Sequence, residues 1–184
     1  MEKRTIFNLN DASLRAEEKE EDGKKKRVIR GYPILFNTPT KIGSWTEIIR
    51  PGALDGVDLS NLYLLGYHMS SMPFARNGVN MRVEIDSNGL FIEVELGDTH
   101  DDDVLYDRVS KGIVDGMSFA FSIEEIQTNF ETKTDEILKF KEVWEVSIVT
   151  FPAYKDAIAI AYEREENKEV NENNKNYIND LLLI

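Results

Sequence analysis

Ser118 is the residue of this sequence around which a catalytic centre could be built. It lies in the segment MSFAF, which alternates like a β-strand, and the chain has no cysteine that could act as a thiolate nucleophile. A serine hydroxyl becomes an effective nucleophile only when a base removes its proton. Histidine is the side chain best suited to that task near neutral pH. A catalytic role for Ser118 therefore requires a histidine that can reach it.

The chain has two histidines, so the choice of base is narrow. His100 begins an aspartate-rich segment, where it is most simply an exposed residue in the first turn of a helix. His68 closes the apolar segment LYLLGYH, where a strand could hold the imidazole in a fixed position. We predict that His68 is the base.

Glu145 is the third candidate, and strand alternation places it near Ser118. Strands are predicted over residues 116–127 and 136–150, and a turn centred on residues 131–132 sets Ser118 opposite Glu145. This register also forms the apolar pairs Met117 with Val146, Phe119 with Trp144 and Ile123 with Phe140. Sliding the strands by two residues would set Ile123 against Glu142, so the first register is preferred, but either one keeps Ser118 and Glu145 on one face. Spacing alone leaves ordinary structural roles open for Ser118, His68 and Glu145.

The rest of the chain is predicted to form mostly short strands joined by hairpin-length links, which indicates an α+β, mainly β domain. Strands are expected over 27–37, 62–68, 79–86 and 90–96, and a short extended piece begins at Thr46 and ends at Pro51-Gly52. Pro33 marks an edge or a bulge, Asn88-Gly89 lies in a turn, and 70–78 is irregular. One short amphipathic helix is expected from Thr99, its N-cap, to a stop at Gly112.

Charge and hydropathy exclude some classes of partner. The formal net charge of −12 argues against nucleic acid, because binding to phosphates depends on clustered Lys and Arg. The basic run 24–27 follows the acidic run 17–22, and we interpret the two as facing strands of a hairpin turning at Asp22-Gly23. No apolar run approaches the roughly 20 residues that span a bilayer, and the N-terminus is polar rather than a signal peptide. We expect a soluble chain that is not exported.

Seven segments of the sequence resemble, in the same order, the prohead maturation proteases of tailed bacteriophages, the caudoviral prohead serine proteases. They are IRGYPILFN, EIIRPGAL, LLGYH, PFAR, GLFIEVELGDT, VSKGIVDGMSFAF and VWEVSIVTFPAYKDA, and they fall within residues 27–160. Each segment alone is a weak signal, but their shared order is specific.

The resemblance implies a herpesvirus-protease-like fold, an antiparallel β-barrel flanked by a few helices. It implies a serine endopeptidase, without a cofactor or metal, packaged inside the prohead in the host cytoplasm. The expected substrates are the scaffold protein or the scaffolding segment of the major capsid protein, and in some cases the enzyme itself. By motif, Ser118 in GMSFAF is the nucleophile, His68 in LLGYH the general base, and Glu145 in WEVS the residue that orients the imidazole.

Two rival interpretations remain open. A catalytically inactive capsid-assembly or scaffold-like protein would keep the fold without requiring His68 and Ser118 to meet. The segment GDTHDDD, residues 97–103, could instead bind a divalent ion, although stabilisation of a helix N-terminus explains its aspartates more economically. Arg76 in PFAR could help to stabilise an oxyanion, but an ordinary surface arginine is the simpler interpretation.

The domain is expected to cover residues 1–162. Residues 163–184 are polar and read as a tail that is disordered or removed by processing. Relatives in the wider fold form dimers, so the resemblance also makes a homo-oligomer possible.

Overall fold

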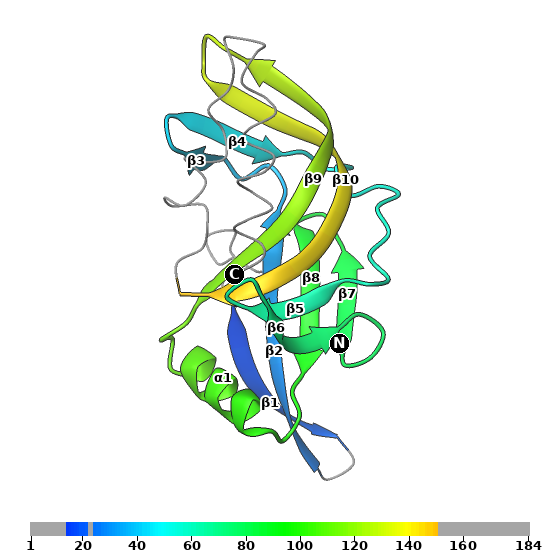
Figure 1. The fold of residues 1–184 in the computed structure, drawn as a ribbon, viewed down its shortest axis with the longest axis vertical. Helices are drawn as coiled ribbons and strands as arrows, with labels where there is room; N and C mark the ends of the chain where they lie inside the picture. The colour runs from blue at the N-terminus through cyan, green and yellow to red at the C-terminus, as the bar shows by residue number, and fades with distance from the viewer. Residues whose placement is uncertain (1–13, 22–23, 151–184) are drawn as a thin grey trace, which may run out of the picture.

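The computed structural model describes residues 14–21 and 24–150, which form two β-sheets and one α-helix (Figure 1). The predicted tail, 163–184, lies outside the described residues. The strands are β1 Arg15–Glu21, β2 Lys24–Leu35, β3 Thr40–Ile42, β4 Trp45–Ile49, β5 Tyr63–Gly66, β6 Met69–Arg76, β7 Met81–Ile85, β8 Gly89–Glu95, β9 Gly116–Asn129 and β10 Thr134–Val149, and the helix is α1 His100–Ser110. The mainly β, α+β class is confirmed. No helix in this part of the chain has the length and apolar character that crossing a bilayer requires.

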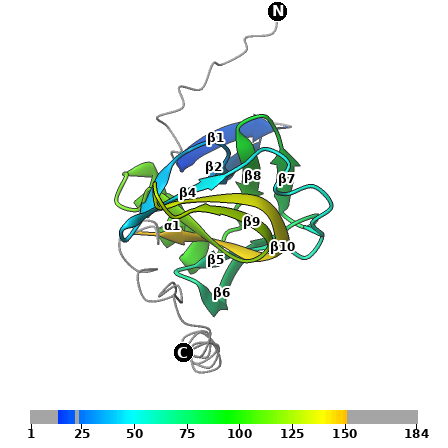
Figure 2. The ribbon, with the colours of Figure 1, turned by 90° about the horizontal axis from the view of Figure 1, so that it is seen from above.

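The two sheets lie on opposite sides of the domain (Figure 2). The first has the strand order β1-β2-β8-β7 and is antiparallel, whereas the second has the order β3-β4-β10-β5-β6, with β9 also paired to β10. Both sheets are open, so the closed barrel that was predicted is not formed by residues 14–21 and 24–150. The expectation of a few flanking helices is likewise wrong for these residues, where α1 is the one helix.

Strand β10 organises the second sheet. It pairs antiparallel with β9 along its whole length, while residues 134–137 pair parallel with β4 and residues 145–148 pair parallel with β5. Because β9 occupies one edge of β10, β4 and β5 share the other edge. Sequence links of hairpin length indicated antiparallel neighbours, but the parallel pairs join strands that are distant in the chain.

Bulges in the β9–β10 hairpin change the predicted register. The pair Ile123–Phe140 is confirmed, but successive register shifts up to Val143 and Glu145 displace β10 by two residues beyond it. The pairs predicted for Met117 and Phe119 are therefore wrong: Met117 is opposite Ile148, and Phe119 is opposite Val146. Trp144 falls at the last bulge and is 48% exposed instead of facing the core.

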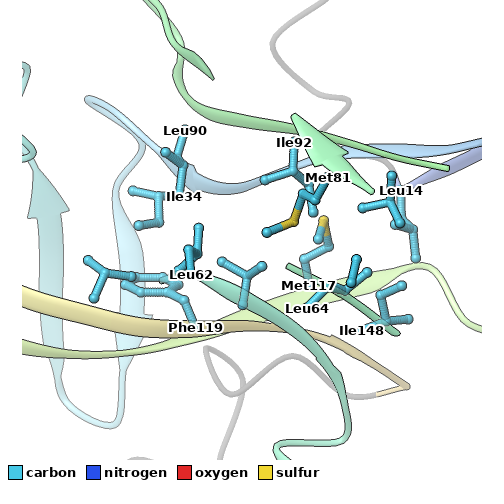
Figure 3. Close-up of a cluster of buried hydrophobic side chains, with 14 of the residues drawn as sticks. Leu14, Ile34, Leu62, Leu64, Met81, Leu90, Ile92, Met117, Phe119 and Ile148 are labelled. Atoms are coloured by element: carbon cyan, nitrogen blue, oxygen red, sulfur yellow. The ribbon is translucent and has the colours of Figure 1, made fainter. Parts of the chain in front are cut away.

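The hydrophobic core lies between the two sheets (Figure 3). Met117 and Phe119 point into it from β9, as predicted. They meet side chains of the opposite sheet, including Ile34 of β2 and Leu90 and Ile92 of β8. Because side chains alternate along a strand, Ser118 faces the other side of the second sheet.

The predicted helix is confirmed, as are its predicted N-cap at Thr99 and its predicted stop at Gly112. Thr99 is the N-cap, and a capping box joins its side chain and backbone to Asp102. The first turn carries Asp101, Asp102 and Asp103, where carboxylates interact favourably with the helix dipole. The helix closes at Lys111, followed by Gly112 in a left-handed conformation.

The N-terminal hairpin, the position of Pro33 and the segment 70–78 were also predicted from the sequence. The N-terminal hairpin is confirmed, with Glu21 opposite Lys24. Pro33 lies in a bulge of β2, so the prediction of a bulge is confirmed. The alternative prediction of an edge strand is wrong, because β2 has a neighbouring strand on each side. The segment 70–78, predicted to be irregular, mostly forms β6, and the preceding strand ends at Gly66, so that His68 lies in a turn.

Gly89 marks a close approach of β8 to β2. Its φ is +152°, and a Cβ atom there would lie 1.9 Å from the backbone carbonyl oxygen of Ile34. We expect Gly89→Ala to lower the free energy of unfolding by about 3 kcal/mol, measured by urea denaturation, because backbone cannot move aside as a flexible side chain can. Gly78→Ala is the matched control, since Gly78 also has a positive φ, +75°, but open space around its Cβ position. Equal losses in the two variants would contradict this explanation.

Candidate active site

His68 lies in a tight turn whose backbone conformation is unusual for its residues. The turn joins β5 to β6 through Tyr67 and His68, whose φ values are +54° and +60°. Asn-Gly is the preferred pair in such turns, because left-handed conformations cost larger residues energy. Two hydrogen bonds tie the turn to β10: the Tyr67 N–H donates to the Ile148 carbonyl at 3.1 Å, and the His68 N–H donates to Ser147 Oγ at 3.1 Å. Contacts with β10 thus support a turn that its own residue types disfavour.

Glu145 of β10 meets the His68 imidazole. His68 Nδ1 and Glu145 Oε1 are 2.6 Å apart, with the imidazole side chain 35% exposed and the glutamate side chain 11% exposed. An ionised carboxylate only accepts hydrogen bonds, so Nδ1 carries a proton, and in the neutral imidazole Nε2 therefore keeps its lone pair. This is the tautomer in which an imidazole can accept a proton from a nucleophile.

Ser147 is a member of the site that the sequence reasoning missed. Its hydroxyl donates to Glu145 Oε2 at 2.5 Å and accepts the backbone N–H of His68, and the residue is fully buried. Its position two residues after Glu145 placed it on the same strand face, which was the one available signal. Nothing in the sequence indicated that the turn at His68 would pack against this hydroxyl.

Ser118 lies on the neighbouring strand, on the same face as this cluster. The predicted pairing of Ser118 with Glu145 is wrong, because the bulges in β10 shift it by two residues: the Cα partner of Ser118 is Ser147, and that of Glu145 is Ala120. Ser118 is 0% exposed, and its Oγ has no hydrogen-bond partner among the described residues. The structure therefore brings His68 and Glu145 into contact, places Ser118 on the adjacent strand, and does not join Ser118 to His68 by a hydrogen bond.

A groove opens beside Glu145. It has a volume of about 460 Å³ and is lined by Tyr63, Leu65, Ser70, Pro73, Trp144 and Glu145. Trp144, displaced from the core by the bulge in β10, forms part of its wall. The groove thus presents largely apolar side chains next to the carboxylate that holds the imidazole.

The other candidate residues have partners elsewhere. Arg76 donates to Asn61, and its guanidinium lies over the ring of Tyr63, 5.6 Å from the centroid. In the segment 97–103, Asp102 belongs to the capping box and Asp103 pairs with Arg27. Within the described part of the chain, no group of three or more potential metal-ligating side chains comes together.

Comparison with protein families identifies most of the chain. The model of the caudovirus prohead serine protease family matches residues 12–172 of its 184 residues. The chain belongs to this family. The resemblance carried by the seven segments is therefore confirmed. Comparison with curated proteins and with solved structures finds no match.

Membership of the caudovirus prohead serine proteases places the chain among serine peptidases with a role in phage capsid maturation. It associates the chain with capsid or scaffold proteins and with the prohead in the host cell. The matched range includes Ser118, His68 and Glu145. The apolar groove and the imidazole–carboxylate pair thus belong to a member of a peptide-cleaving family.

Proposed function

We propose that the chain is a serine endopeptidase that cleaves scaffold protein, or the scaffolding segment of the capsid subunit, during prohead maturation. Ser118 is the nucleophile, His68 the general base and Glu145 the residue that orients and stabilises the imidazole. The observation that carries the proposal is the 2.6 Å contact between His68 Nδ1 and Glu145 Oε1 in a prohead serine protease.

The proposed reaction follows the order of a serine protease triad. His68 Nε2 takes the proton of Ser118 Oγ as this oxygen attacks the peptide carbonyl carbon. The imidazolium, stabilised by Glu145, then protonates the leaving amine, and an acyl-enzyme forms at Ser118. A water molecule, deprotonated by His68, hydrolyses this ester and restores the serine.

The buried state of Ser118 adds one requirement to this mechanism. Its Oγ is enclosed and makes no hydrogen bond to a described residue, so a change of conformation must expose it and bring it to Nε2. Catalytic hydrogen bonds commonly tighten only when substrate is bound. Binding of a substrate segment in the groove beside Glu145 would supply such a change at the site itself.

The same burial favours a second candidate function, an inactive capsid-assembly protein on this fold. Such a protein would have no need for an exposed Ser118 hydroxyl, and the His68–Glu145 contact would serve only to hold the turn on β10. The two functions differ in whether peptide bonds are cut.

Co-expression with the cognate capsid and scaffold proteins tests this difference. We expect new fragments when the chain is present, with the intact masses of the products locating the cut bonds. A parallel culture that lacks the chain is the control. If the capsid and scaffold proteins have identical masses in both cultures, the endopeptidase proposal is wrong and the assembly function is favoured.

A further inference from the structure

We propose that Ser147 is a positioning residue of the catalytic centre, which holds His68 and Glu145 in the arrangement that proton transfer requires. This inference rests on the proposed function. Ser147 is the one described residue with hydrogen bonds to both of these residues: its Oγ lies 3.1 Å from the His68 backbone nitrogen and 2.5 Å from Glu145 Oε2. With the contact between His68 Nδ1 and Glu145 Oε1, these bonds close a ring through the three residues.

The protons of this ring can be assigned without conflict. The His68 N–H can only donate, so Ser147 Oγ accepts it. The Ser147 hydroxyl then has its own proton available for Glu145 Oε2, while the His68 Nδ1–H occupies Oε1. Each donor has an acceptor, and both carboxylate oxygens accept a hydrogen bond. These bonds fix the rotation of the Glu145 carboxylate and the orientation of the His68 imidazole.

The location of the ring explains why one hydroxyl would matter. His68 has a left-handed backbone conformation in a two-residue turn, which a histidine adopts only when its surroundings impose it. Ser147 lies on β10, whose position is set by pairing with β9 on one edge and β5 on the other. The hydroxyl therefore links the strained turn that carries His68 to a strand that is paired on both edges.

Loss of this hydroxyl would free both partners together. In Ser147→Ala the His68 N–H and Glu145 Oε2 each lose a partner, and the bond to Glu145 is buried, so that water does not readily replace the lost hydroxyl there. The carboxylate can then rotate and the turn can shift. Because a misplacement of about 1 Å in a catalytic group can lower the rate about 10²-fold, we expect a loss of that order in cleavage.

The first measurement is the initial rate of cleavage of the scaffold or capsid protein that co-expression identifies as the substrate. Ser147→Ala is compared with the wild type and with Ser122→Ala. Ser122 is a matched control because it lies in the same hairpin and its buried hydroxyl has no hydrogen-bond partner among the described residues. We expect Ser122→Ala to cleave at the wild-type rate and Ser147→Ala to be about 10²-fold slower.

The second measurement reports on the ring itself. In a His100→Gln background His68 is the only histidine, so the proton NMR resonance of its Nδ1–H can be assigned. A short hydrogen bond to a carboxylate shifts this resonance far downfield, and we expect Ser147→Ala to move it upfield or broaden it, while Ser122→Ala leaves it unchanged. If the substitution only reduced the amount of folded protein, the cleavage rate would fall, but the resonance of the protein that remains folded would not shift.

The two measurements together decide the inference. A slower rate with a changed resonance supports positioning by Ser147. A wild-type rate, or an unchanged resonance, overturns it. If Ser118→Ala cleaves as the wild type does, the proposed function fails instead, and the resonance still decides whether Ser147 holds His68 against Glu145.

Discussion

Replacement of Ser118 by alanine is expected to abolish cleavage of the co-expressed capsid and scaffold proteins without destabilising the fold. Loss of the nucleophile in a serine protease lowers the rate about 10⁶-fold, which leaves no fragments detectable by mass spectrometry. The stability expectation comes from the structure: the Ser118 hydroxyl is buried and has no hydrogen-bond partner among the described residues, so its removal leaves no polar group unpaired. Removal of such a hydroxyl is neutral or stabilising.

Two measurements therefore accompany this variant, the pattern of fragments and the thermal unfolding midpoint. An inactive variant with a midpoint at or above that of the wild type assigns the nucleophile and excludes misfolding as the cause. Ser122→Ala, which removes another unpaired buried hydroxyl from the same hairpin, is expected to cleave normally. Fragments from Ser118→Ala that match those of the wild type would refute the assignment.

Glu145→Gln is expected to have the second largest effect, a loss of about 10⁴ in kcat, by comparison with the equivalent change in Ser-His-Asp triads. An amide presents both a donor and an acceptor to two partners that each donate, His68 Nδ1–H and the Ser147 hydroxyl. If the amide NH₂ faces His68, the neutral imidazole must carry its proton on Nε2, which is then unable to accept one from Ser118. If the NH₂ faces Ser147, the Ser147 hydroxyl proton is left without its acceptor in a buried site.

The matched control for this variant is Glu142→Gln, on the same strand. Glu142 is exposed and accepts a hydrogen bond from the Trp144 indole, so its neutralisation changes the charge of β10 by the same amount outside the ring. We expect Glu142→Gln to keep the wild-type kcat. Equal losses in the two variants would show that charge on the strand, rather than the contact with His68, is responsible.

Much of the local structure could be predicted because short-range rules determine it. The helix from His100 to Ser110 has a cap, a capping box and a first turn of aspartates that all lie within a few residues of each other. Alternation in the β9–β10 hairpin correctly placed Met117 and Phe119 in the core. It also placed Ser118 and Glu145 on one face, and this survives the bulges because they displace the strand by two residues, which preserves parity.

The errors share a different cause, which is competition between distant segments. A 16-residue strand, β10, pairs parallel with β4 and with β5 on one edge, and no local pattern encodes which segments occupy that edge. Its bulges put Trp144 on the surface, next to the groove, where simple alternation had placed it against Phe119. The predicted barrel depended on the same long-range pairing, and the described strands form open sheets instead.

The sequence by itself determined the kinds of residue available for chemistry: two histidines from which to choose a base, no cysteine, and a serine and a glutamate on the same side of a strand pair. Only the tertiary structure decided that His68 lies in a left-handed turn, meets Glu145 and shares Ser147 with it. The physical reason is that these contacts join residues 77 and 79 positions apart. Their geometry depends on where β5 docks on β10, and this docking is set by the packing of the whole core, whereas strand parity and helix capping are set by neighbours in the chain.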